Sequence, residues 1–241
     1  MNETQLKEIR NIWIDFLNLP FDIKTYTDKI QHPIFFSSYR VLVGTKFDGL
    51  KHYNLTNPLE HNKCLAYYIK ESQNWDVQDY FISVQPEFRL VFVDKTKDLL
   101  CDKDLCDALI FAYTSTSFPN SNPHISKNRI VNLFAYARNA ISTYRDDTYY
   151  LLQPELTVYR GVDDYNNNRL YATDWCVNVI DAINYAQVRG HNGAVYKATI
   201  PTSAVFTIID GEAVIDYTKI VWPIEFIGNV KDLIKEDYIV H

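Results

Sequence analysis

The spacing of apolar side chains predicts two amphipathic helices in the first 150 residues. One covers residues 4–18, with Thr4 as its expected N-cap and Pro20 as its expected stop. The other has Ser126 as its cap and runs to about Tyr144. The buried stripes recur at helical spacing: Ile9, Ile12, Trp13, Phe16 and Leu17 in the first helix, and Ile130, Leu133, Phe134, Ala137 and Ile141 in the second.

The segments between these helices predict a mixture of elements. Residues 33–43 and 88–93 have the composition of strands, and residues 63–72 read as a helix. Residues 105–113 are apolar enough to lie in a core. Residues 114–123 contain two prolines and several Ser and Asn, which favours a loop. We therefore expect a mixed, mainly helical region over residues 1–150.

From Leu156 onward, short β-rich runs surround one helix, which is expected over residues 177–187. The sequence therefore predicts an α+β fold, with a boundary near residue 150 and a second domain over residues 151–241. The strands of that domain are expected at residues 156–159, 170–173, 194–200, 204–209, 213–215 and 224–227.

Composition and charge narrow the possible functions. With 47% hydrophobic and 22% charged residues, the chain has the composition of a folded protein. The formal net charge of -6 argues against sequence-independent binding to nucleic acid. The nearest approach to a basic cluster lies on the second helix, where a solvated face is the expected interpretation: Lys127, Arg129, Arg138 and Arg145.

The cysteines and histidines predict no metal site. The four cysteines show neither a pairing rhythm nor metal-ligand spacing, and the six histidines are dispersed. The N-terminus lacks the apolar core of a signal peptide, and no apolar run approaches the length of a membrane span. A cytoplasmic location without membrane contact is therefore expected.

The first motif that could take part in binding or catalysis is Val-Tyr-Arg-Gly at residues 158–161. It places Arg160 at the end of a short strand, between Tyr159 and Gly161. A guanidinium can bind a phosphate or ribose through two hydrogen bonds, and a glycine lets a ligand approach the backbone. Taken alone, a solvated arginine is the simpler interpretation.

The second motif is Leu-Tyr-Ala-Thr-Asp-Trp-Cys at residues 170–176, ahead of a helix that carries Tyr185 within Ala-Ile-Asn-Tyr-Ala at residues 182–186. Here Thr173 offers a hydroxyl, and the ring of Trp175 could stack on a flat ligand. A core tryptophan beneath a helix cap is the simpler alternative.

The third motif is Ile-Asp-Gly-Glu-Ala-Val-Ile at residues 209–215, which follows a strand ending in Ile-Pro at residues 200–201. Carboxylates at positions i and i+2 of an extended segment face the same side. Asp210 and Glu212 are therefore expected to point together, one toward a sugar and the other toward a reaction partner. The alternative is a charged turn between strands.

The order and spacing of these motifs over residues 156–230 resemble the ADP-ribosyltransferase family of the Arg–Ser–Glu type, which includes clostridial-toxin-like and phage enzymes. The resemblance implies a split β-sandwich, NAD as co-substrate and transfer of ADP-ribose to a macromolecule. Arg160 matches the arginine that orients NAD, and Glu212 matches the glutamate that stabilises the oxocarbenium-like transition state. Asp210 matches the position that touches the acceptor. Tyr159, Gly161, Thr173, Trp175 and Tyr185 would line the NAD site, with Trp175 against the nicotinamide.

Two departures from the family pattern bear on activity and acceptor. The Ser-containing motif is degenerate, since Thr173 is the best remaining hydroxyl, and Asp174 or Cys176 aligns instead if the register slips by one. The connector between Pro201 and Glu212 is short, which nearly removes the acceptor-recognition loop of many relatives. An inactive NAD- or partner-binding relative, or simple NAD hydrolysis, therefore remains an alternative.

The acceptor is expected to be a protein, RNA or DNA, because members of the family modify all three. Residues 1–150 are expected to recognise the target or a partner. By analogy, an intracellular toxin or phage-defence factor is the expected context, with an antitoxin or regulatory protein as a further partner.

Overall fold

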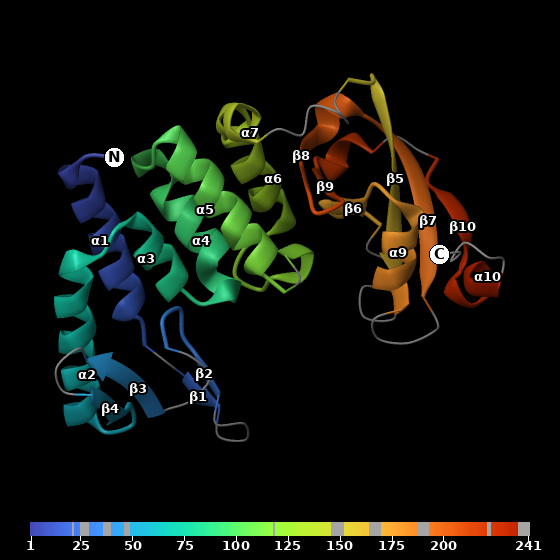
Figure 1. Cartoon of the computed structure of the whole chain (residues 1–241). Helices are drawn as coiled ribbons and strands as arrows, with labels where there is room; N and C mark the ends of the chain where they lie inside the picture. The colour runs from blue at the N-terminus through green and yellow to red at the C-terminus, as the bar shows by residue number, and fades with distance from the viewer. Residues whose placement is uncertain are drawn as a thin grey trace. The chain divides into compact units, whose positions relative to one another are not determined.

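The computed structural model describes residues 1–20, 22–24, 29–35, 40–45, 49–117, 119–145, 152–163, 170–187, 193–220 and 223–235. Its fold is α+β (Figure 1). The chain divides into two compact units, Met1–Ile125 and Ser126–His241. Residue 150, near which the sequence suggests a boundary, lies outside the described residues.

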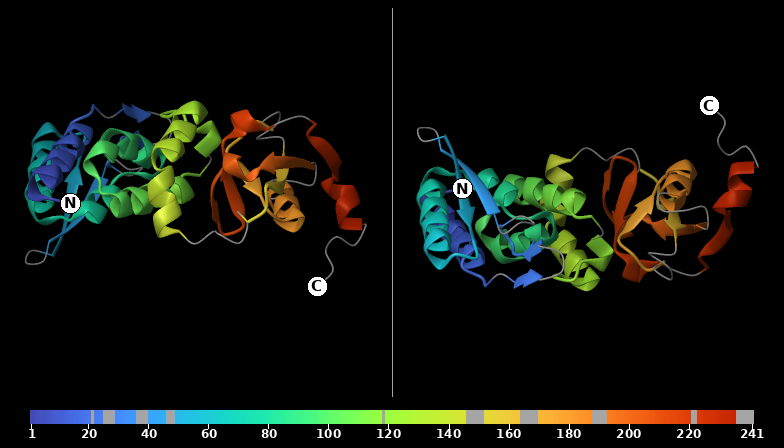
Figure 2. Two further views of the ribbon diagram at one scale, coloured as in Figure 1. Left: turned by 90° about the horizontal axis from the view of Figure 1, so that it is seen from above. Right: turned by 90° about the horizontal axis from the view of Figure 1, so that it is seen from below.

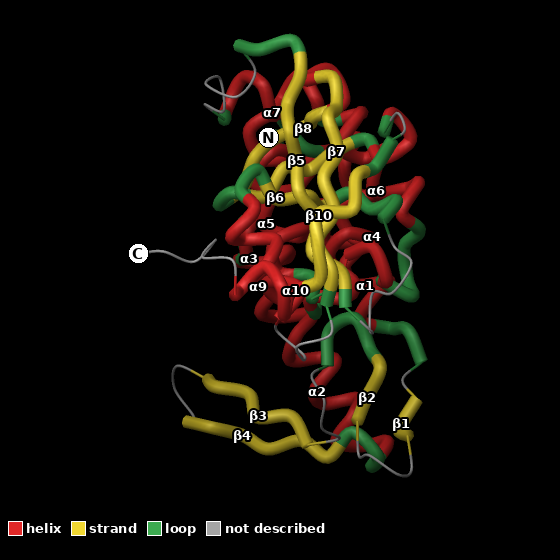
Figure 3. Tube along the Cα trace, turned by 90° about the vertical axis from the view of Figure 1, so that its right-hand side faces the viewer, coloured by secondary structure: helices red, strands yellow, loops and turns green. Residues whose placement is uncertain are grey.

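The N-terminal unit contains helices and two antiparallel hairpins. The hairpins pair β1 (Asp22–Lys24) with β2 (Lys29–Gln31), and β3 (Arg40–Thr45) with β4 (Gly49–Asn54). Strand β4 lies against α2 (Figure 3). The helices are α1 (Glu3–Leu17), α2 (Pro58–Glu71), α3 (Val77–Ser83), α4 (Pro86–Thr96) and α5 (Asp102–Ser115), with short 3-10 turns at Ser72–Asn74, Lys97–Leu99 and Pro119–Ser121.

Helix α1 confirms the first predicted helix but not its cap. The cap is Asn2, whose Oδ1 accepts a hydrogen bond from the Gln5 amide at 2.9 Å, while the Gln5 side chain accepts one from the Asn2 amide at 2.9 Å. This reciprocal pair satisfies two amides, which explains why Asn2 prevails over Thr4. The indole of Trp13 on this helix is fully buried and packs edge-on against Trp75, with ring centroids 4.9 Å apart.

One predicted strand of this unit is wrong. Residues 88–93 belong to α4, which begins with Pro86 in its first turn. A short apolar run buried on several sides has no helical period, so the pattern alone does not separate a strand from a core helix. Within residues 33–43, β3 begins only at Arg40, residues 33–35 form a bend, and residues 36–39 lie outside the description. The helix predicted over residues 63–72 is confirmed within α2, and the core segment 105–113 lies in α5.

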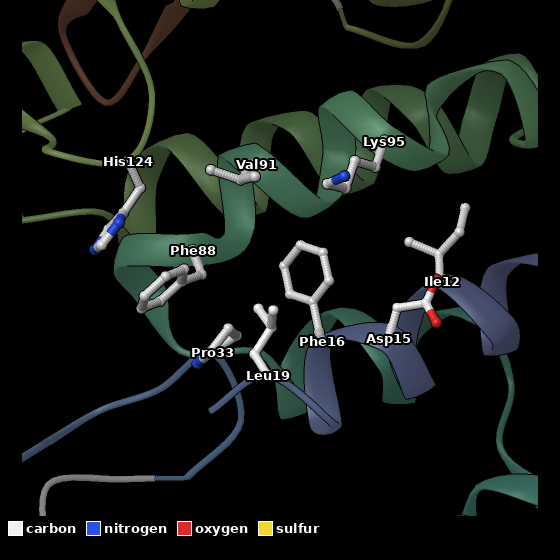
Figure 4. A pocket seen from close by; sticks show the side chains of 9 residues that line it. All are labelled: Ile12, Asp15, Phe16, Leu19, Pro33, Phe88, Val91, Lys95 and His124. Carbon is white, nitrogen blue, oxygen red and sulfur yellow. The ribbon is translucent and has the colours of Figure 1, made fainter. Parts of the chain in front are cut away.

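An apolar hollow of about 450 Å³ lies between α1 and α4 of this unit (Figure 4). Phe16 forms part of its wall and packs edge-on against Phe92. Asp15 and Lys95 stand at one end of the hollow and His124 at the other. The imidazole of His124 stacks on Phe88 with ring centroids 3.9 Å apart, and burial lowers the pKa of His124.

The C-terminal unit is built on a six-stranded antiparallel sheet with the order β10-β7-β5-β6-β9-β8. Beside the strands, the unit contains α6 (Lys127–Tyr136), α7 (Arg138–Tyr144), α9 (Val179–Gln187) and α10 (Val230–Lys235), and 3-10 turns at Thr202–Ala204 and Tyr217–Lys219. The strands are β5 (Glu155–Val162), β6 (Asp174–Cys176), β7 (Ala194–Pro201), β8 (Val205–Ile209), β9 (Glu212–Ile215) and β10 (Glu225–Asn229).

The predicted long helix is present as two helices that meet at Ala137, with Ser126 as the predicted cap of the first. Its buried stripe is confirmed. The basic side chains on it do not form a simple solvated face. Arg138 donates hydrogen bonds to the carbonyls of Val205 and Ser203, both at 3.2 Å, and Arg145 donates one to the carbonyl of Ile208 at 3.1 Å. These arginines hold the helices on the edge strand β8 and satisfy two of its carbonyls and one of the 3-10 turn before it.

The sheet joins two halves at a narrow seam. Strands β5 and β7 pair along their whole length, from Glu155 opposite Pro201 to Val162 opposite Ala194. Strands β5 and β6, in contrast, meet at one pair, Tyr159 opposite Cys176. The seam therefore separates β10, β7 and β5 from β6, β9 and β8.

Helix α9 covers one face of the sheet at very short range (Figure 2). A methyl group added at Gly161 of β5 would lie 2.0 Å from the carbonyl oxygen of Ala182 and 2.9 Å from the amide of Ala186. One added at Gly193 would lie 2.2 Å from the carbonyl oxygen of Ala186. The helix approaches the strands this closely because the four residues at these contacts are all Gly or Ala.

Candidate functional site

The three sequence motifs meet where β5, β6 and β9 lie side by side. Cys176 is opposite Tyr159 on one side and opposite Glu212 on the other. Residues directly opposite in antiparallel strands present their side chains on the same face, and Cys176 and Tyr159 belong to the cluster under α9. Glu212 therefore lies on the face of the sheet that α9 covers.

Arg160 is nearly buried and is held by an ion pair. The residue is 6% exposed, and its Nη1 lies 3.0 Å from Oδ1 of Asp174. The same nitrogen donates a hydrogen bond to the backbone carbonyl of Asp174. Both contacts cross the seam from β5 to the first residue of β6.

Glu212 shares its electrostatic environment with Arg160. Burial raises the pKa of Glu212, and a hydrogen bond from Tyr185 lowers it. The charge of Asp174 raises this pKa further, that of Arg160 lowers it, and that of Asp210 raises it. Arg160 thus acts on the Glu212 carboxyl group, but its effect on the pKa is smaller than that of burial, of Tyr185 and of Asp174.

Tyr185 comes from the exposed side of α9, where the residue is 52% exposed. Burial of its phenol raises the pKa of Tyr185, and the hydrogen bond to Glu212 adds to this because it is made by the protonated phenol. The hydroxyl therefore donates to the Glu212 carboxylate at physiological pH. Helix α9 is positioned for this by Asn178, whose Oδ1 accepts a hydrogen bond from the Ile180 amide at 2.7 Å.

The predicted geometry of the acidic pair is wrong. Asp210 and Gly211 form the two-residue turn between β8 and β9, with φ angles of 49° and 85°. Asp-Gly favours such a turn because both central residues have positive φ. The backbone reverses there, so Asp210 is not the i−2 neighbour of Glu212 on one extended strand. Asp210 is exposed at the turn, while Glu212 begins β9 and is half-buried.

Thr173 and Trp175, which the sequence predicts to line the site, are buried in the core. The strand predicted over residues 170–173 is wrong, because β6 begins at Asp174. Trp175 is fully buried on the opposite face, and its indole nitrogen donates to the carbonyl of Ala172 at 3.1 Å. This is the core tryptophan of the simpler alternative, with no exposed ring face. Thr173 is also fully buried, and its carbonyl accepts a hydrogen bond from the Ile215 amide at 2.8 Å.

Asp174 and Cys176, which the sequence predicts only as alternatives to Thr173, are candidates for functional residues. Asp174 pairs with Arg160, and Cys176 lies between Tyr159 and Glu212. Burial and the neighbouring carboxylates of Glu212, Asp181 and Asp174 raise the pKa of the Cys176 thiol to about 12. The thiol is therefore protonated and unreactive at neutral pH.

Native alkylation should modify one cysteine, Cys101. It is exposed, whereas Cys64, Cys106 and Cys176 are buried, and burial raises the pKa of Cys64 to about 12. We expect iodoacetamide to add one group to the folded chain and four groups to the unfolded chain, as counted by intact mass. The Cys101→Ser variant should take up none while folded. Rapid labelling of Cys176 in the folded protein would contradict the burial of this site.

No group of His, Cys, Asp and Glu side chains that could hold a metal ion occurs in the part of the chain that the structure describes. Among the same residues, no helix has the length and apolar character needed to traverse a bilayer. Comparison with family models, curated proteins and solved structures found no match to this chain.

Proposed function

We propose that the C-terminal unit is an NAD-dependent ADP-ribosyltransferase that transfers ADP-ribose to a macromolecular acceptor. The observation that supports this most is that β6 links the first and third motifs, because Asp174 pairs with Arg160 of β5 and Cys176 lies opposite Glu212 of β9. The two half-sheets on either side of the seam would be the two parts of a split β-sandwich. Residues 1–150 would then recognise the acceptor or a regulatory partner.

The chemistry follows from the charges. Arg160 binds the diphosphate of NAD, since a guanidinium is suited to two-point recognition of phosphate. The bond between nicotinamide and C1′ of the ribose breaks, and nicotinamide leaves with the bonding electron pair. Positive charge develops on the ribose, and the Glu212 carboxylate stabilises it. A nucleophile of the acceptor then bonds to C1′ and loses its proton.

Tyr185 has a positioning role in this proposal. Its hydroxyl hydrogen-bonds Glu212 from outside the sheet, which restricts the carboxylate to one orientation. A preorganised charge stabilises a transition state better than a mobile one because it need not reorient during the reaction. About half of the surface of Tyr185 is exposed, so the same residue can contact the co-substrate.

The test is incubation of the full chain with NAD carrying labelled adenine and with extracts containing protein, RNA and DNA. Transfer predicts release of nicotinamide and label attached to one class of macromolecule. Free ADP-ribose formed without an extract would instead indicate hydrolysis, with water as the acceptor. Absence of nicotinamide release under all these conditions would reject the enzymatic function.

A catalytically inactive relative is the second candidate, and the state of Arg160 favours it. The guanidinium is nearly buried and already bonded to Asp174 through a carboxylate and a carbonyl oxygen. Thr173 and Trp175 are likewise turned into the core. NAD or a partner protein binding without any nicotinamide release would support this candidate.

A further inference from the structure

The Asp174 carboxylate already binds the Arg160 guanidinium, the group that would have to bind an anionic ligand. The two side chains differ in their access to solvent, since the side chain of Arg160 is 7% exposed and that of Asp174 is 32% exposed. The arginine therefore has little freedom to leave the seam, whereas the aspartate can turn outward. Any exchange of partners at this pair must occur by movement of Asp174.

The ion pair opposes anion binding in two ways. An approaching phosphate must break the contact of 3.0 Å between Nη1 of Arg160 and Oδ1 of Asp174. It must also approach the negative charge of Asp174, and this repulsion is poorly screened beside a half-buried site. The charge of Asp174 also raises the pKa of Glu212. One side chain thus influences both groups of the candidate site.

We propose that Asp174 is a built-in competitor for Arg160 and sets the affinity of this site for ligands that carry a diphosphate. In the free protein the carboxylate holds the guanidinium. A bound diphosphate takes its place, and Asp174 turns toward solvent. The identity of the ligand as NAD rests on the proposed function, but the competition itself requires only an anion at Arg160.

Because of the backbone contact, the effect of the Asp174 carboxylate on anion binding can be tested without disturbing the fold. Nη1 of Arg160 also bonds the carbonyl oxygen of Asp174, and that oxygen remains whatever the side chain. Asp174→Asn keeps the shape and removes the charge, and Asp174→Ser also shortens the side chain. Both variants should therefore retain the anchor of Arg160 on β6.

The experiment measures binding of ADP to the full chain by calorimetry. ADP carries the diphosphate without the bond that the proposed reaction breaks. Partly exposed ion pairs contribute up to about 1 kcal/mol, so the dissociation constant should fall by up to about fivefold in Asp174→Asn and Asp174→Ser. The matched control is Asp181→Asn, which removes a charge near Cys176 that is not paired with Arg160.

Each outcome decides the proposal. Tighter ADP binding in both Asp174 variants than in Asp181→Asn supports the competition. Equal or weaker binding in a folded Asp174 variant overturns it, as does an equal gain in Asp181→Asn, which would indicate a general charge effect. No ADP binding in any of these proteins also overturns it. If binding tightens but NAD is never cleaved, the competition stands and the transferase function fails.

Discussion

Replacement of Glu212 by glutamine is expected to reduce nicotinamide release by about 10²–10³-fold, because removal of one preorganised group that stabilises developing charge has an effect of that size. The amide retains an oxygen that can accept the hydrogen bond from Tyr185, so the fold should be unchanged. The measurement is the initial rate of nicotinamide release at saturating NAD, with circular dichroism to verify folding.

The matched control is Glu225→Gln on β10. Glu225 is an exposed glutamate of the same sheet, and its Oε2 lies 3.5 Å from Nζ of Lys197. It is not among the charged groups that shift the pKa of Glu212. We expect its activity to equal that of the unmodified chain. Full activity in Glu212→Gln would remove Glu212 from the chemistry.

The same substitution is expected to lower activity but to increase the stability of the fold. Burial raises the pKa of Glu212 in the folded state, so ionised Glu212 destabilises the fold relative to the unfolded chain. This cost is absent below the unfolded pKa of about 4.3 and develops as the pH rises through the higher folded pKa. Glu212→Gln should therefore raise the melting temperature at pH 7, and the gain should disappear below about pH 4.3. A gain that is the same at both pH values would contradict the raised pKa.

Substitution of Gly161 by alanine is expected to destabilise the C-terminal unit strongly. The added methyl group would lie 2.0 Å from a carbonyl oxygen of α9, and that atom belongs to backbone that cannot rotate away. Overpacking of a core typically costs about 1–3 kcal/mol, and a clash with backbone belongs at the upper end or beyond. The measurement is the free energy of unfolding from urea titration.

Gly228→Ala is the matched control for Gly161→Ala. Its methyl group would lie 3.0 Å from Cδ2 of Leu233, the end of a side chain that can move. We expect a small change in stability at Gly228 and a large one at Gly161. Equal effects would show that the close approach of α9 to β5 is not what requires glycine at residue 161.

The helices were predictable where one face alone is buried. The stripe from Ile9 to Leu17 and the stripe from Ile130 to Ile141 have the period of a helix because water covers their other faces. Residues 88–93 lack this contrast, since Arg89, Leu90, Phe92 and Val93 are all buried. The signal that could have identified α4 is Pro86, because proline is favoured in the first turn of a helix.

The sequence predicted which residues are candidates for the site better than it predicted how they are arranged. Asp-Gly at residues 210–211 is a strong hairpin signal, and its use would have placed Asp210 in a turn. The role of Gly161 is difficult to predict for a different reason. A glycine that allows a ligand to approach the backbone and one that allows a helix to pack closely look the same in the sequence. The pair of Arg160 with Asp174 joins two strands, and no local pattern encodes it.

The seam between β5 and β6 has a mechanical consequence. A β-sheet resists bending through the rungs of its hydrogen-bonded ladder, and here one rung, Tyr159 opposite Cys176, joins the two halves. We therefore expect the sheet to bend most easily along this line, where the side chain of Arg160 and helix α9 provide the other links between the two halves.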